Sequence, residues 1–278
     1  MVEDKGRIIG YRDSEVARLL PKGHQGLVFD RYLPLWAMGD DGEWQIPSGQ
    51  IQRALQKFAH DFPQAADEAQ PLLDHVHARQ TRILELRQGR RLELRSTSPL
   101  VIGLGIDHPT ENGFLFDPVI GVPWIPATAV KGLCRRGAAL LDVKQEVVEK
   151  ALGGTTDDCL GVGDLVFLDA YPASWPELEV QVLTAHYSSY QRWLGNESKK
   201  KPPNLREAPH GLDSPVPVHH LSVARRVAWH FGLFSRSGDS RLIDQALEWL
   251  TEALEWLGAG GRTAVGFGYF EGDSQAPE

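Results

Sequence analysis

The order of strand-like and helix-like segments after residue 90 restricts the possible folds of this chain more than any other feature. Apolar and polar residues alternate from Arg91 to Ser98, which is typical of a strand. Apolar residues recur at helical spacing further along, and glycine or proline separates the segments. The predicted elements are a strand over 91–105, a helix over 126–141 with a second piece over 143–152, a strand over 164–170, one strand or a hairpin over 216–234, a helix over 240–257 capped by Ser240, and a final strand up to about 270.

Strand, helix, strand, strand, helix, strand is the ferredoxin-like order. We therefore expect an α+β protein with a ferredoxin-like (RRM-like) core over 90–271. Residues 1–89 are expected to form a mainly helical N-terminal extension, since their patterns are helical and carry no chemical motif. The segment 172–217 is rich in proline and lysine with little periodicity, which indicates a long insertion or loop, and 272–278 forms a tail.

Charge is unevenly distributed along the chain. Lys and Arg number 29 against 37 Asp and Glu, giving a net charge of −8, which excludes a uniformly basic nucleic-acid-binding surface but not a local one. Basic residues gather over 79–95, 124–141 and 192–206, either as solvated faces or as a surface for a polyanion.

Cysteine usage and hydropathy favour a cytoplasmic protein. Cys134 and Cys159 form neither a CxxC pair nor a zinc signature, so we expect no metal and no cofactor. No signal peptide and no apolar run of membrane-spanning length are present, so we expect no membrane contact.

The helix after Pro126 carries a cationic face. Thr128, Lys131 and Arg135 follow one another at spacings of three and four, while Arg136 is their neighbour. Cations near a helix start oppose the helix dipole, and a phosphate bound by the free N–H groups of the first turn would offset them. A solvated amphipathic helix remains the alternative.

A glycine loop, Gly258-Ala-Gly-Gly-Arg-Thr, precedes the final strand. Glycines allow a backbone to approach a phosphate closely and present unhindered N–H donors. The loop follows a helix and opens a strand, so it is neither a dinucleotide fingerprint nor a P-loop. A helix cap followed by a tight turn is the alternative.

These two segments, 121–135 and 258–268, together resemble the RAMP superfamily of CRISPR proteins. Three further motifs narrow the resemblance to the sixth-subunit family of type III-B (Cmr) effector complexes. They are His108-Pro-Thr-Glu-Asn-Gly-Phe, Phe167-Leu-Asp-Ala-Tyr-Pro and Ala185-His-Tyr-Ser-Ser-Tyr.

The resemblance implies a non-catalytic RNA-binding subunit that supports assembly of a complex in antiviral defence. Its partners would be CRISPR RNA, target RNA near the guide 3′-side, and the first, backbone and small Cmr subunits. The candidate RNA-binding residues are Thr128, Lys131, Arg135, Arg136, Gly258, Gly260, Gly261, Arg262 and Thr263.

Two other functions stay open. Some superfamily relatives are metal-independent endoribonucleases, and His108 or His186, acting with Lys131 or Tyr187, could activate a ribose 2′-hydroxyl. A purely structural scaffold could instead use tryptophans on the last helix, either in the core or towards another subunit.

Overall fold

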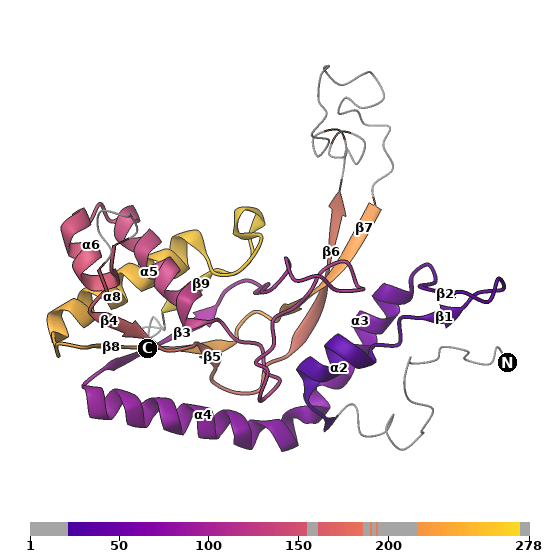
Figure 1. Ribbon diagram of the computed structural model, residues 1–278, viewed down its shortest axis with the longest axis horizontal. Helices are drawn as coiled ribbons and strands as arrows, with labels where there is room; N and C mark the ends of the chain where they lie inside the picture. Colours follow the sequence, from indigo (N-terminus) through magenta and orange to yellow (C-terminus); the bar gives the residue numbers. More distant parts are fainter. Residues whose placement is uncertain (1–21, 155–160, 186–189, 191–192, 194–215, 273–278) are drawn as a thin grey trace, which may run out of the picture.

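The computed structural model describes residues 22–154, 161–185, 190, 193 and 216–272 (Figure 1). These residues combine helices with antiparallel sheet, so the mixed helix-and-sheet class predicted from the sequence is confirmed. No helix within them has the length and apolar character that crossing a membrane requires.

A five-stranded antiparallel sheet forms the centre of the fold. Its strands are β3 (Arg90–Ser96), β4 (Leu165–Phe167), β5 (Tyr171–Pro172), β8 (Ala228–Ser235) and β9 (Phe270–Gly272). β8 pairs with β3, β4 and β5, and β3 also pairs with β9, so the path across the sheet is β4-β8-β3-β9. β8 is rich in aromatic and apolar residues because both faces of this central strand are covered.

Helices cover both faces of the sheet (Figure 1). α5 (Ala127–Leu140) and α8 (Ser240–Glu252) pack together on one face, above the fully buried Trp229 and Phe231. α4 (Ala66–Arg87) lies along the other face. The packing is close at Gly232, where a Cβ would lie 3.3 Å from Leu84 Cδ1 of α4.

The N-terminal elements share the central core. They are α2 (Gln25–Tyr32), β1 (Ala37–Met38), β2 (Trp44–Gln45), α3 (Gln50–Asp61) and the 3₁₀ turn Phe62–Ala65, which leads into α4. Phe29, Phe58 and Phe62 surround Phe116, with ring centroids 5.6, 6.0 and 6.1 Å from it. These rings belong to one continuous cluster with Trp229, so the described part of the predicted extension is mainly helical but packs as part of the core.

A long hairpin projects from this body (Figure 1). β6 (Leu178–Ala185) and β7 (Val216–Val223) pair antiparallel along their whole length, and most residues between them lie outside the described part. The segment 172–217 was expected to be a long insertion or a loop. A loop is wrong for Leu178–Ala185, which form β6, while an insertion stays a prediction. The expectation of one strand or a hairpin over 216–234 is also wrong, because β7 pairs with β6 whereas β8 joins the central sheet.

Two predicted boundaries also differ from the structure. The first strand ends at Ser96 instead of continuing to residue 105, and Leu100 forms only an isolated bridge with Val223. α8 is capped by Asp239 instead of Ser240, because the Asp239 carboxylate accepts the Leu242 N–H at 3.2 Å. The helix continues as a π-helical turn, Ala253–Leu257.

Candidate nucleic-acid interface

The start of α5 is bonded to the protein's own carboxylate. Pro126 occupies the N-cap position and provides no side-chain cap, while Asp169, which follows β4, accepts the Ala127 N–H at 2.7 Å. A negative charge here stabilises the positive end of the helix dipole. Sequence analysis expected the free N–H groups of the first turn to bind a phosphate. The Ala127 N–H is bonded to Asp169 instead, so the prediction is wrong for this group.

Arg135 connects α5 to the end of α6 (Gln145–Leu152). Its guanidinium donates to the carbonyl oxygens of Leu152 at 3.2 Å and Gly153 at 2.8 Å. These carbonyls end α6, where a cation stabilises the negative end of the helix dipole. Arg135 therefore has a structural contact within the chain, and its contact with RNA stays a prediction.

Lys131 lies on the same face of α5, one turn earlier. It is half-buried and has no ion-pair partner in the part of the chain that the structure describes. Thr128 and Arg136 are exposed. The opposite side of α5 is buried through Val130 and Leu133, which confirms the amphipathic helix predicted from the sequence.

Several backbone N–H groups of the glycine loop after α8 donate hydrogen bonds to carbonyl oxygens of the same chain. The donor–acceptor pairs are Gly258 N to Ala253 O (2.9 Å), Ala259 N to Gly268 O (2.8 Å) and Gly261 N to Val101 O (2.7 Å). Gly260 has φ 76°, and a Cβ there would lie 2.2 Å from Val101 O, so the close approach requires glycine. The glycines therefore hold the loop against neighbouring backbone, and contact with RNA by Gly258, Gly260, Gly261 and Thr263 stays a prediction.

Arg262 lies beside His220 of β7. The Nε atom of Arg262 is buried and has no hydrogen-bond partner among the described residues, and both ring nitrogens of His220 are buried as well. Burial, with a smaller contribution from the charge of Arg262, lowers the pKa of His220 to about 4. The Nε atom of Arg262 is thus withdrawn from solvent, and contact of Arg262 with RNA stays a prediction.

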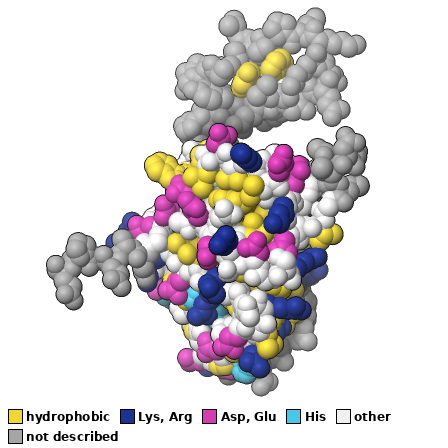
Figure 2. Space-filling model, turned by 90° about the vertical axis from the view of Figure 1, so that its left-hand side faces the viewer, with side chains coloured by type: hydrophobic (Ala, Val, Ile, Leu, Met, Phe, Trp, Pro, Cys, Tyr) yellow, Lys and Arg dark blue, Asp and Glu magenta, His cyan; other side chains and the backbone are white. Residues whose placement is uncertain are grey.

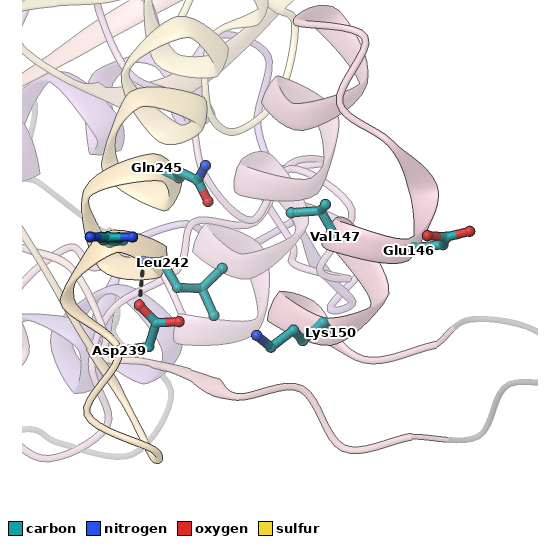
Figure 3. A pocket seen from close by; sticks show the side chains of 7 residues that line it. Glu146, Val147, Lys150, Asp239, Leu242 and Gln245 are labelled. Atoms are coloured by element: carbon teal, nitrogen blue, oxygen red, sulfur yellow. Dashed lines mark hydrogen bonds between the residues drawn. The ribbon is translucent and has the colours of Figure 1, made fainter.

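A cavity of about 410 Å³ lies between α6 and α8 (Figure 3). Its lining includes Glu146, Lys150, Asp239 and Arg241, so acidic and basic groups balance, and Asp239 is already bonded as the cap of α8. Figure 2 shows basic and acidic side chains interspersed on this side of the molecule. The described part of this side therefore carries no uniformly basic surface.

His108 has a structural environment. Its ring stacks on Phe29 with centroids 4.2 Å apart, Nδ1 lies 2.7 Å from Thr110 Oγ1, and Nε2 lies 3.2 Å from the Phe29 carbonyl oxygen. Burial lowers its pKa. His186 and Tyr187 lie outside the described residues, and within the described ones no group of three or more His, Cys, Asp or Glu is placed to hold a metal ion.

The two tryptophans of the last helix have different surroundings. Trp249 is 3% exposed, whereas Trp256 is 68% exposed. Seven residues apart, they would share one side of a continuous α-helix, but the intervening π-helical turn changes the rotation per residue and turns Trp256 outward. Contact of Trp256 with another subunit stays a prediction.

The part of the chain that runs from β3 to β9 matches a known family in sequence. Residues 93–271 match the RAMP superfamily, and the chain belongs to it.

Within that superfamily the chain is similar to Cmr6. The protein named CRISPR system Cmr subunit Cmr6 from Pyrococcus furiosus is 24% identical over 233 residues, covering 63% of this chain and 66% of that protein. Its namesake from Saccharolobus solfataricus is 28% identical over 167 residues, covering 58% and 49%. The chain thus spans just under two thirds of one relative and about half of the other.

A solved structure supports the fold. One chain of the structure described as the type III-B Cmr-beta complex bound to cognate target RNA superposes with a TM-score of 0.55 and 20% identity, covering 81% of this chain and 74% of that chain.

Sequence analysis missed two residues that build this site. Asp169 caps α5 with its carboxylate, and its carbonyl oxygen accepts the Gln80 amide of α4 at 2.8 Å. Gly137 lets α5 cross α8 closely, since a Cβ there would lie 1.7 Å from the Trp249 carbonyl oxygen. An acid near the end of a predicted strand and a glycine inside an amphipathic helix were the available signals.

Proposed function

We propose that this chain is a non-catalytic RNA-binding subunit of a type III-B Cmr effector complex. It would contact CRISPR RNA or target RNA near the guide 3′-side and assemble with the first, backbone and small subunits. The observation that carries the proposal is the superfamily match over 93–271, joined to the Cmr6 similarity, because that range contains both α5 and the glycine loop.

The outward face of α5 supports RNA contact on physical grounds. Lys131 and Arg136 are cations on a helix anchored by its buried side, and Thr128 adds a hydroxyl. Such side chains bind phosphates without reading bases. This suits a complex in which base pairing with the guide selects the target.

We also assign a ferredoxin-like topology to the core. The elements β3, α5, β4, β8, α8 and β9 follow the strand, helix, strand, strand, helix, strand order. The order β4-β8-β3-β9 across the sheet agrees with this assignment. On this assignment α6, β5 and the β6–β7 hairpin are additions to the core.

Salt-dependent RNA binding tests the interface. We expect Lys131→Gln to weaken binding of unrelated RNA sequences equally and to reduce the slope of log K against log[salt] by about 0.7 to 0.9. Lys144→Gln, at an exposed position before α6, is the matched control and leaves the slope unchanged. Unchanged slopes for both Lys131→Gln and Arg136→Gln would contradict the assignment of α5.

Incubation with labelled CRISPR-repeat RNA in EDTA tests the absence of catalysis. We expect intact RNA after binding has reached equilibrium. Products of defined length that disappear in a His186→Ala variant would favour the endoribonuclease alternative.

A further inference from the structure

A pair of histidines joins α4 to the outer face of the sheet. His77 of α4 and His230 of β8 place their Nδ1 atoms 3.2 Å apart. The Nε2 atom of His77 lies 2.9 Å from the Pro172 carbonyl oxygen, and Nε2 of His230 lies 2.8 Å from the Glu93 carboxylate. His230 is buried and His77 is half-buried.

Counting protons across these contacts shows that two neutral rings do not satisfy them. A carbonyl and a carboxylate only accept, so each Nε2 must carry a hydrogen. Both Nδ1 atoms of neutral rings would then be acceptors, and their lone pairs would face each other at 3.2 Å. Three contacts need three hydrogens, whereas two neutral imidazoles supply two.

We propose that His77 and His230 share one additional proton between their Nδ1 atoms, and that this pair, balanced by Glu93, is a pH-sensitive clasp between α4 and the sheet. With three hydrogens, every contact becomes a hydrogen bond. The Glu93 carboxylate offsets the charge of the pair, so the cluster is neutral as a whole.

A metal ion between the two Nδ1 atoms is a less suitable explanation of their contact than a shared proton. Histidines that bind zinc do donate their other N–H to a carboxylate or carbonyl, as these two do. Zinc, however, requires three or four protein ligands. No third His, Cys, Asp or Glu joins them as a ligand among the described residues.

The charged groups around the pair act on it in opposite directions. Burial lowers the pKa of both rings, and Arg91 of β3 lowers each further. Asp74 of α4 favours charge on His77, and Glu93 of β3 favours charge on His230. Tyr171 of β5, the register partner of His230, donates its hydroxyl to Asp117, and burial raises its pKa, so it stays neutral.

The clasp therefore weakens on both sides of an intermediate pH. When the pH rises above the first titration step, the shared proton leaves and two acceptors face each other. When the pH falls below the ordinary histidine value of about 6.5, the unfolded chain takes up a proton on both rings, but the folded pair takes up only one. Since the two sites are coupled, these steps belong to the pair.

Imidazole ¹⁵N NMR of the full chain between pH 4.5 and 9 tests the proposal. We expect the pair to take up its protons in two separate steps, with one Nδ1 hydrogen bridging the two rings between these steps. A single step in which both rings gain a proton together, or two unprotonated Nδ1 atoms down to pH 4.5, would overturn the proposal. A spectrum that changes on adding EDTA or Zn²⁺ would also overturn it, in favour of a bound metal.

Hydrogen exchange of the α4 amides measures the effect on docking. We expect protection to be greatest between the two steps and to fall by about threefold or more on either side. His77→Asn places a non-titrating amide near the Nδ1 position and should abolish this pH dependence. His75→Asn, at an exposed position on the same helix, should retain it. Equal pH dependence in both variants would contradict the clasp.

Discussion

The two segments assigned to RNA contact, α5 and the glycine loop, are built in opposite ways. α5 presents side chains from a helix whose first N–H is bonded to Asp169, so we expect that Lys131 can be replaced without disturbing the fold. The loop makes close backbone contacts, and three of its first four residues donate their N–H groups within the chain. A glycine-rich pattern before a strand can therefore reflect tight packing of backbone on backbone even where it resembles a phosphate-binding loop.

Of the variants in the glycine loop and on the outward face of α5, Gly268→Ala should destabilise the protein most, because the loop depends on close backbone contacts and that face does not. A Cβ at this position would lie 1.9 Å from the Ala259 carbonyl oxygen, at φ 76°. We expect a loss of about 3 kcal/mol or more in the free energy of unfolding, measured in urea. Gly266→Ala, at φ 98° with no atom within 4 Å of its Cβ, is the control and should cost about 1 kcal/mol. Equal losses would show that backbone conformation alone, and not close packing, requires these glycines.

His220→Phe tests how the loop is joined to the hairpin. Because the pKa of His220 is lowered to about 4, the unfolded chain binds a proton more readily than the folded chain between about pH 6.5 and 4. The stability that neutral His220 contributes at neutral pH is therefore lost as the pH falls through this range. Between neutral pH and pH 5, the free energy of unfolding should fall by about 1 to 2 kcal/mol less in His220→Phe than in the wild type. The same acid sensitivity in the variant would contradict a buried neutral His220.

Arg135→Ala and Lys131→Ala should differ in stability, because Arg135 has a structural contact within the chain and Lys131 has no ion-pair partner among the described residues. The variant leaves the Leu152 and Gly153 carbonyls without their donor, so we expect a loss of about 1 to 2 kcal/mol on urea unfolding. Lys131→Ala should stay within about 0.5 kcal/mol of the wild type. Similar losses for both would remove the distinction between these two cations.

Gly132→Ala should have the smallest effect on the free energy of unfolding, and it should stabilise the protein instead of destabilising it. A Cβ at Gly132 meets no atom within 4 Å, so alanine should raise stability by about 0.5 to 1 kcal/mol through its helix propensity. Gly137→Ala on the same helix should instead destabilise, because its Cβ would meet the Trp249 carbonyl oxygen. A gain in both variants would contradict the close crossing of α5 and α8.

Local patterns predicted the helices and most of the central sheet. The apolar spacing in α5 and α8 and the alternation along β3 depend on one segment at a time, so the sequence is sufficient to predict them. The pairing of β6 with β7 joins strands separated by 30 residues, and no local pattern encodes it. The strand after residue 216 was therefore assigned to the wrong neighbour.

The candidate site was predictable as a set of residues but not as a set of contacts. Sequence spacing placed Thr128, Lys131 and Arg135 along one face of α5. It could not show that Asp169 bonds the helix start or that Arg135 donates to the end of α6. Both contacts depend on tertiary packing, which brings residues 17 to 42 positions apart into hydrogen-bond distance.

The phenylalanine cluster around Phe116 has a consequence for how the molecule can be divided. Phe29, Phe58 and Phe62 come from the first quarter of the chain, yet they form one wall of the interior that also contains Trp229. Cutting the chain near residue 89 would expose this wall to water and leave the sheet-bearing portion prone to aggregate. The two portions should therefore melt together, and neither should be recoverable as an autonomous fragment.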